Sequence, residues 1–73
     1  MYFYFEVNGV IDAKEFNAEW EMQRTLNKWP PAKFHWEGNR LMVSVDSNNV
    51  PEPELRKMLN MSLGSQKRRL KEV

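Results

Sequence analysis

The segment 32–46, AKFHWEGNRLMVSVD, most constrains the fold of this chain because it has the pattern of a β-hairpin. Apolar and polar residues alternate on both sides of Gly38-Asn39, and glycine at the first turn position favours a two-residue type II′ turn. Such a turn places two apolar pairs opposite each other, Phe34 with Val43 and Trp36 with Leu41. A shift of one residue would move every apolar side chain to the other face, so the register is well specified.

The two faces of this predicted hairpin differ in character. One face is apolar and carries Phe34, Trp36, Leu41, Val43 and Val45. The other carries Lys33, His35, Glu37, Arg40, Met42 and Ser44. This pattern is typical of an antiparallel pair with one buried and one exposed face. We also expect Glu37 and Arg40, opposite each other beside the turn, to form a charge pair.

Residues 2–7 predict a further strand, because β-favouring residues alternate there as YFYFEV. Phe3, Phe5 and Val7 are the expected buried set, since they carry no polar atom that would need a partner. Tyr2 and Tyr4 then lie on the exposed face.

Two helices complete the pattern. Residues 13–28 predict the first, with Asp12 as N-cap and Glu15 completing a capping box. Its apolar side is expected to hold Ala13, Phe16, Trp20, Met22 and Leu26. After a polar turn at 47–49, the second helix opens within 50–54, and its inward stripe is Leu55, Met58, Leu59 and Leu63. Whether this helix ends at Gly64 or continues to about Lys71 is left open by the sequence.

The order β-α-β-β-α predicts a single small α+β domain over residues 1–73, with a three-stranded sheet and two helices packed on one face. Two positions remain open for the first strand. It lies parallel beside the second strand through a right-handed crossover, or antiparallel beside the third. Because the chain has 73 residues and no cysteine, side-chain packing must stabilise the domain without disulfides.

The composition excludes several classes of protein. No run of 18 apolar residues exists, so we expect no membrane partner. The N-terminus lacks the basic start and the small-residue cleavage site of a signal peptide. Together with the absence of cysteine, this predicts a cytoplasmic protein.

Candidate catalytic groups are few. His35 is the only histidine, and Ser44 is the nearest nucleophile on its predicted face, without a pocket or an oxyanion-hole loop. The carboxylates show no metal-ligand spacing, and the glycines form no phosphate-binding loop. We therefore predict no enzyme, no catalytic residue, no metal site and no cofactor.

The exposed face of the predicted sheet is the strongest candidate for recognition. The predicted partner-binding residues are Tyr2, Tyr4, Lys33, His35, Arg40 and Met42. The leading hypothesis is a small non-enzymatic regulator of bacterial or viral type that recognises another protein.

Two alternatives stay open. Tyrosines among basic side chains can also stack on bases and follow phosphates, which would make the chain a nucleic-acid-binding module. Residues 64–73 would contribute as a basic helix end or tail, with a charge balance of +3 from Lys67, Arg68, Arg69, Lys71 and one glutamate. The second alternative is a homodimer formed through the open sheet or an edge strand.

Overall fold

The structure, a computed structural model, describes residues 2–45 and 50–71. Its elements in chain order are β1 (Tyr2–Glu6), α1 (Ala13–Asn27), β2 (Ala32–Glu37), β3 (Arg40–Val45), α2 (Glu52–Leu63) and the short 3₁₀ helix η1 (Gly64–Gln66). This order agrees with the predicted β-α-β-β-α pattern. The polar turn predicted at 47–49 lies outside the described residues.

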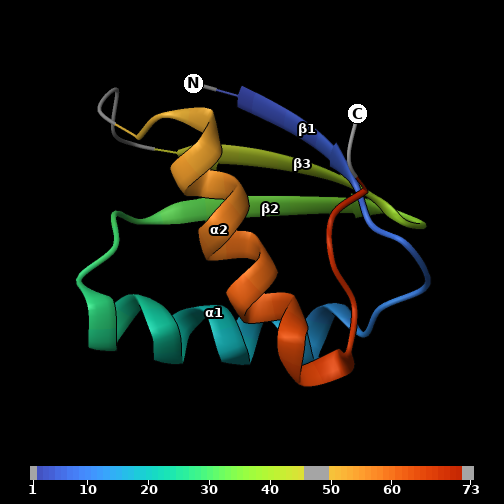
Figure 1. Ribbon diagram of the computed structural model, residues 1–73, viewed down its shortest axis with the longest axis horizontal. Helices are drawn as coiled ribbons and strands as arrows, with labels where there is room; N and C mark the ends of the chain where they lie inside the picture. The colour runs from blue at the N-terminus through green and yellow to red at the C-terminus, as the bar shows by residue number, and fades with distance from the viewer. Residues whose placement is uncertain (1, 46–49, 72–73) are drawn as a thin grey trace.

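The three strands form one antiparallel sheet in the order β1-β3-β2 (Figure 1). The first strand therefore lies beside the third, which decides between the two positions that the sequence left open. Because β3 runs antiparallel to both neighbours, β1 and β2 run parallel to each other with β3 between them. Both β1 and β2 are thus edge strands.

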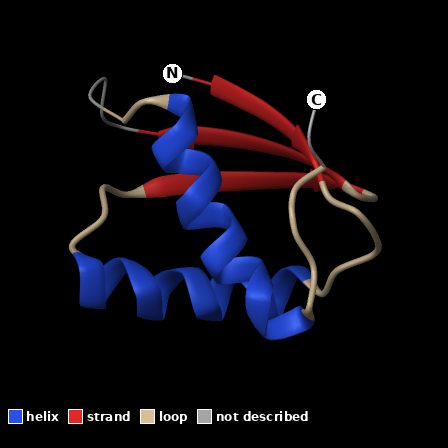
Figure 2. Cartoon of the chain, viewed as in Figure 1, coloured by secondary structure: helices blue, strands red, loops and turns tan. Residues whose placement is uncertain are grey.

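Both helices pack on one face of the sheet, as the sequence predicted (Figures 1 and 2). The core between the sheet and the helices consists of buried side chains from strands, from both helices and from the Val7–Leu70 bridge: Phe5, Val7, Phe16, Trp20, Leu41, Val43, Val45, Leu55, Met58, Leu59, Leu63 and Leu70. Burial of each large apolar side chain contributes roughly 1.5–3 kcal/mol to folding. No helix among the described residues covers the opposite face of the sheet.

The hairpin has the predicted register. Phe34 lies opposite Val43, and Trp36 lies opposite Leu41. Gly38 has a φ of 61°, while Asn39 keeps a negative φ. This combination is that of a type II′ turn, whose first position favours glycine because a Cβ would be strained there.

Helix α1 begins with the predicted cap but completes it differently. The Asp12 carboxylate accepts hydrogen bonds from the backbone N–H groups of Lys14 at 2.9 Å and Glu15 at 3.2 Å. In a capping box the Glu15 side chain would accept a hydrogen bond from the Asp12 N–H. Here the Asp12 N–H donates instead to Oε1 of Gln66 at 2.7 Å. The helix ends at Asn27, where Lys28 adopts a left-handed conformation with φ of 56°.

The buried side of α1 is narrower than predicted. Phe16 and Trp20 are buried, whereas Met22 is 49% and Leu26 is 72% exposed. The two aromatic rings fill the space against the sheet, and both pack edge-on against Phe34 with ring centroids 4.9 Å apart. Met22 and Leu26 lie about 100° or more around the helix from this direction, so they point away from the core.

Helix α2 buries the predicted stripe of Leu55, Met58, Leu59 and Leu63. Beyond η1, Lys67 turns the chain with a φ of 57°, so the helix does not continue to Lys71. The segment 68–71 instead returns to the end of β1, where Leu70 pairs with Val7 in an antiparallel bridge. Burial of the Leu70 side chain, which is only 2% exposed, favours this path over a solvated helical tail.

Candidate functional site

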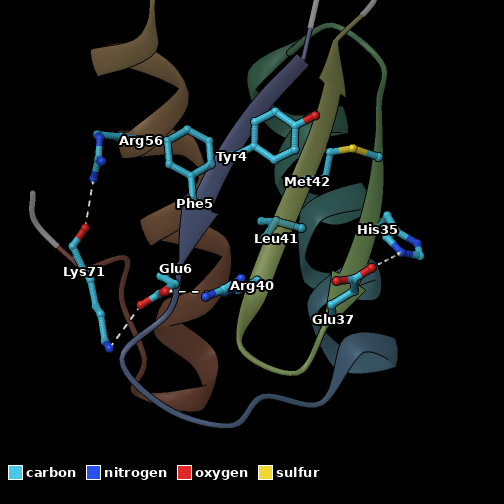
Figure 3. A pocket seen from close by; sticks show the side chains of 10 residues that line it. All are labelled: Tyr4, Phe5, Glu6, His35, Glu37, Arg40, Leu41, Met42, Arg56 and Lys71. Atoms are coloured by element: carbon cyan, nitrogen blue, oxygen red, sulfur yellow. Dashed lines mark hydrogen bonds and ion pairs between the residues drawn. The ribbon is translucent and has the colours of Figure 1, made fainter.

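The open face of the sheet brings together all six residues that the sequence placed in the partner-binding set. Figure 3 looks onto this face, with both helices behind the strands. Across the strands the residues form three rows: Tyr2, Ser44 and Lys33; Tyr4, Met42 and His35; Glu6, Arg40 and Glu37. We call these nine residues the open face. Alternation of side chains along each strand places them together, opposite the core.

Aromatic groups from β1 and a thioether group from the central strand β3 lie next to each other on the open face. Tyr2 is 63% and Tyr4 is 74% exposed. Met42 is half-buried between Tyr4 and His35 in the middle row. Because Tyr2 and Tyr4 are two residues apart on one strand, their rings leave the sheet about 7 Å apart on the same side. These side chains form a contact surface that combines apolar rings with phenolic hydroxyl groups.

The third row forms ion pairs in a different combination from the predicted one. The Arg40 Nε atom lies 3.6 Å from Oε1 of Glu6, and Glu37 lies 3.6 Å from Nε2 of His35. The expected pair of Glu37 with Arg40 is therefore wrong, although the two residues are opposite each other. Glu6 and Arg40 are a non-hydrogen-bonded pair of the ladder, in which side chains approach more closely than in the hydrogen-bonded pair beside the turn.

An open depression of about 670 Å³ lies along this face and the outer edge of β1. Its lining residues are Tyr4, Phe5, Glu6, His35, Glu37, Arg40, Leu41, Met42, Arg56 and Lys71 (Figure 3). Two cations border it at the edge of β1. Arg56 of α2 lies over the Phe5 ring with its Cζ 5.1 Å from the centroid, and Lys71 Nζ lies 3.2 Å from Glu6. The lining contains no serine or threonine to act as a nucleophile beside His35.

The predicted basic tail is folded against the end of β1. Asn8 N–H donates to the Arg69 carbonyl oxygen at 3.0 Å, and Lys71 N–H donates to the Glu6 carbonyl oxygen at 2.8 Å. The Arg68 guanidinium lies against Gly9. A Cβ atom added to Gly9 would be 2.8 Å from the Cζ of Arg68. Lys71 is the only one of Lys67, Arg68, Arg69 and Lys71 that lines the depression.

Five residues that line the depression are absent from both the predicted partner-binding set and the basic tail: Phe5, Glu6, Glu37, Leu41 and Arg56. In the sequence, Arg56 is one of several polar residues of the second predicted helix and nothing distinguishes it. Only the packing of α2 beside β1 brings its guanidinium to the Phe5 ring. Glu6 is different, because its place in the alternating strand already put it on the exposed face. Its role in joining Arg40 to Lys71 depends on the strand order.

Metal-ligand clusters and membrane-spanning helices are both absent from the part of the chain that the structure describes. Within 2–45 and 50–71, no three His, Asp or Glu side chains gather in a way that could hold a metal ion. In the same part of the chain, neither helix is long and apolar enough to cross a bilayer. Comparisons with protein families, with curated proteins and with solved structures found no match to this chain.

Proposed function

We propose that this chain is a non-enzymatic binding protein that recognises another protein through the open face of its sheet. The observation that supports it best is the pair of exposed rings, Tyr2 and Tyr4, beside the half-buried Met42 on the face without helices. Tyrosine, methionine and arginine are enriched at protein interfaces, where they supply contact area with few rotatable bonds or adaptable packing. The proposal includes a regulatory role in the cytoplasm, of bacterial or viral type.

The charges of the open face favour a protein partner over a nucleic acid. Lys33 and Arg40 are balanced by Glu6 and Glu37, so the face has no positive excess when His35 is neutral. Arg40 and Lys71 both contact Glu6, which competes with phosphate for these cations. Binding to a phosphate backbone requires an excess of basic groups. A mixed rim around an apolar centre is typical of protein interfaces instead.

Capture from a native lysate tests this proposal. Immobilised chain is compared with a variant carrying Tyr2→Ala, Tyr4→Ala and Arg40→Ala, and retained proteins are identified by mass spectrometry. We expect the triple variant to lose the captured protein while its thermal melt stays nearly unchanged, since all three side chains are exposed. A matched control, Met22→Ala with Leu26→Ala, removes exposed apolar side chains from α1 and should keep capture. Equal capture by the triple variant would refute the proposal.

A titration with oligonucleotides separates the nucleic-acid alternative. Single- and double-stranded oligonucleotides are added at two salt concentrations, and binding is followed by fluorescence anisotropy. We expect no binding at either concentration, because Arg40 and Lys71 both contact Glu6 and the open face carries as many carboxylates as lysines and arginines. Binding at low salt that weakens steeply at high salt would favour the nucleic-acid alternative instead.

A further inference from the structure

The outer edge of β2 presents unpaired backbone groups. The Val7 N–H donates to the Asn39 carbonyl oxygen at 2.8 Å. This bond shows which residues of β3 direct their backbone groups toward β1 and which direct them toward β2. From this pattern and the hairpin register, Phe34 and Trp36 direct their N–H and C=O groups away from β3. No hydrogen bond between described residues uses these outward groups.

The other edge of the sheet is treated differently. On β1 the returning segment 68–71 covers the end of the strand, through the Val7–Leu70 bridge and the bonds of Glu6 and Asn8. On β2 no described segment takes this position. An uncovered edge strand is a template for pairing with another strand. The returning segment reaches only the Glu6 end of β1, so the uncovered stretch of edge is longer on β2 than on β1.

We propose that two copies of this chain associate through β2, in antiparallel register about a twofold axis that passes between their two His35 residues. In this register Phe34 of each copy exchanges two backbone hydrogen bonds with Trp36 of the other, which gives four bonds across the seam. The result is a six-stranded sheet, with all four helices on one face. This inference does not depend on the partner proposed above for the open face.

Charge complementarity selects the second copy as the occupant and sets the register. With His35 on the axis, Lys33 of each copy lies opposite Glu37 of the other, and the two opposite-charge pairs stabilise the seam. A second register, with Phe34 on the axis, pairs as many residues of β2 as the register with His35 on the axis. It places Lys33 opposite His35 and gives Glu37 no cation from the other copy. Only the register with His35 on the axis pairs the Lys33 of each copy with the Glu37 of the other.

The aromatic side chains under the strand point to the same arrangement. Phe34 and Trp36 are half-buried, so both keep exposed surface on the core side of β2. In the proposed register each Phe34 ring lies beside Trp36 of the second copy, an aromatic pair of the kind that stabilises neighbouring strands. The two open faces then become one continuous surface on the side away from the helices.

Cysteine cross-linking tests the register, because the natural chain has no cysteine. In the proposed dimer the two His35 Cα atoms are about 4.5 Å apart, which is within the range of a disulfide. We expect His35→Cys to form disulfide dimers under mild oxidation at least tenfold faster than Glu54→Cys, an exposed control on α2. Cross-linking of His35→Cys no faster than this control would overturn the proposal. Faster cross-linking through Lys33→Cys would show a different register and also overturn it.

A charge-swap series provides an independent readout by sedimentation across a dilution series. Lys33→Glu or Glu37→Lys alone places like charges across the seam, and we expect each to raise the dimer dissociation constant about tenfold. The double variant restores opposite charges and should recover the original constant. Glu54→Lys, with the same charge change on α2, should have no effect. A chain that stays monomeric at all concentrations, or a double variant that fails to recover, contradicts the proposed dimer.

Discussion

The side chain of Gln66 binds both backbone polar groups of Asp12. It accepts a hydrogen bond from the Asp12 N–H at 2.7 Å and donates one to the Asp12 carbonyl oxygen at 2.9 Å. The two residues are 54 positions apart in the chain. Through this contact the end of η1 is attached to the start of α1, and the segment that follows is directed back toward β1.

Replacement of Gln66 by alanine should destabilise the domain. Loss of two exposed hydrogen bonds is expected to lower the free energy of unfolding by about 1–2 kcal/mol. Urea denaturation followed by tryptophan fluorescence measures the difference. The neighbouring substitution Ser65→Ala, at an exposed residue of η1, is the control and should have little effect. Equal stability of the two variants would contradict the structural role of the Gln66 amide.

The N-cap of α1 gives a second prediction. Asp12→Ala removes the acceptor for two backbone N–H groups and should cost about 1 kcal/mol of stability. Asp12→Asn keeps a side-chain oxygen at the same position and should retain most of it. Thermal unfolding monitored by circular dichroism compares the two. A loss of equal size in both variants would mean that charge, rather than the hydrogen bonds, carries the effect.

The two leucines at positions 70 and 26 should respond in opposite ways to truncation. Leu70→Ala removes a buried side chain and is expected to destabilise the domain by about 2–4 kcal/mol. Leu26→Ala removes an exposed one and should change the stability by less than about 0.5 kcal/mol. Denaturant titration of both variants is the measurement. A small effect of Leu70→Ala would show that the segment 68–71 does not contribute to the core.

Two glycines should show opposite effects of added alanine. Gly38 has a φ of 61°, so Gly38→Ala should cost about 1–2 kcal/mol even though no atom lies near its Cβ position. Gly64 has right-handed helical angles and equally open space, so Gly64→Ala should stabilise by about 0.4–1 kcal/mol. Differential scanning calorimetry of the pair tests both signs. A destabilising Gly64→Ala would contradict the helical conformation at that residue.

The sequence could predict which side of its own strand each residue of the candidate site lies on, because this depends only on the alternation of side chains. The alternation places Tyr4 on the exposed side of its strand and His35 on the exposed side of the hairpin. Sequence reasoning could not bring Tyr4, Met42 and His35 into one row, because that depends on β1 lying beside β3. The contacts of Arg56 with Phe5 and of Lys71 with Glu6 depend on long-range packing and left no periodic signal in the sequence.

The sequence by itself determined the parts of this protein that short-range physics controls. The two-residue turn at Gly38 and the alternation beside it set the register of Phe34 with Val43, because a slip would expose the apolar set. The tertiary structure alone decided the strand order, the narrow buried side of α1 and the return of Leu70 to Val7. Both edges of the predicted hairpin offer the same kind of backbone groups, so local sequence cannot choose between them. The choice is made by the packing of the whole core, which is a property of all its side chains together.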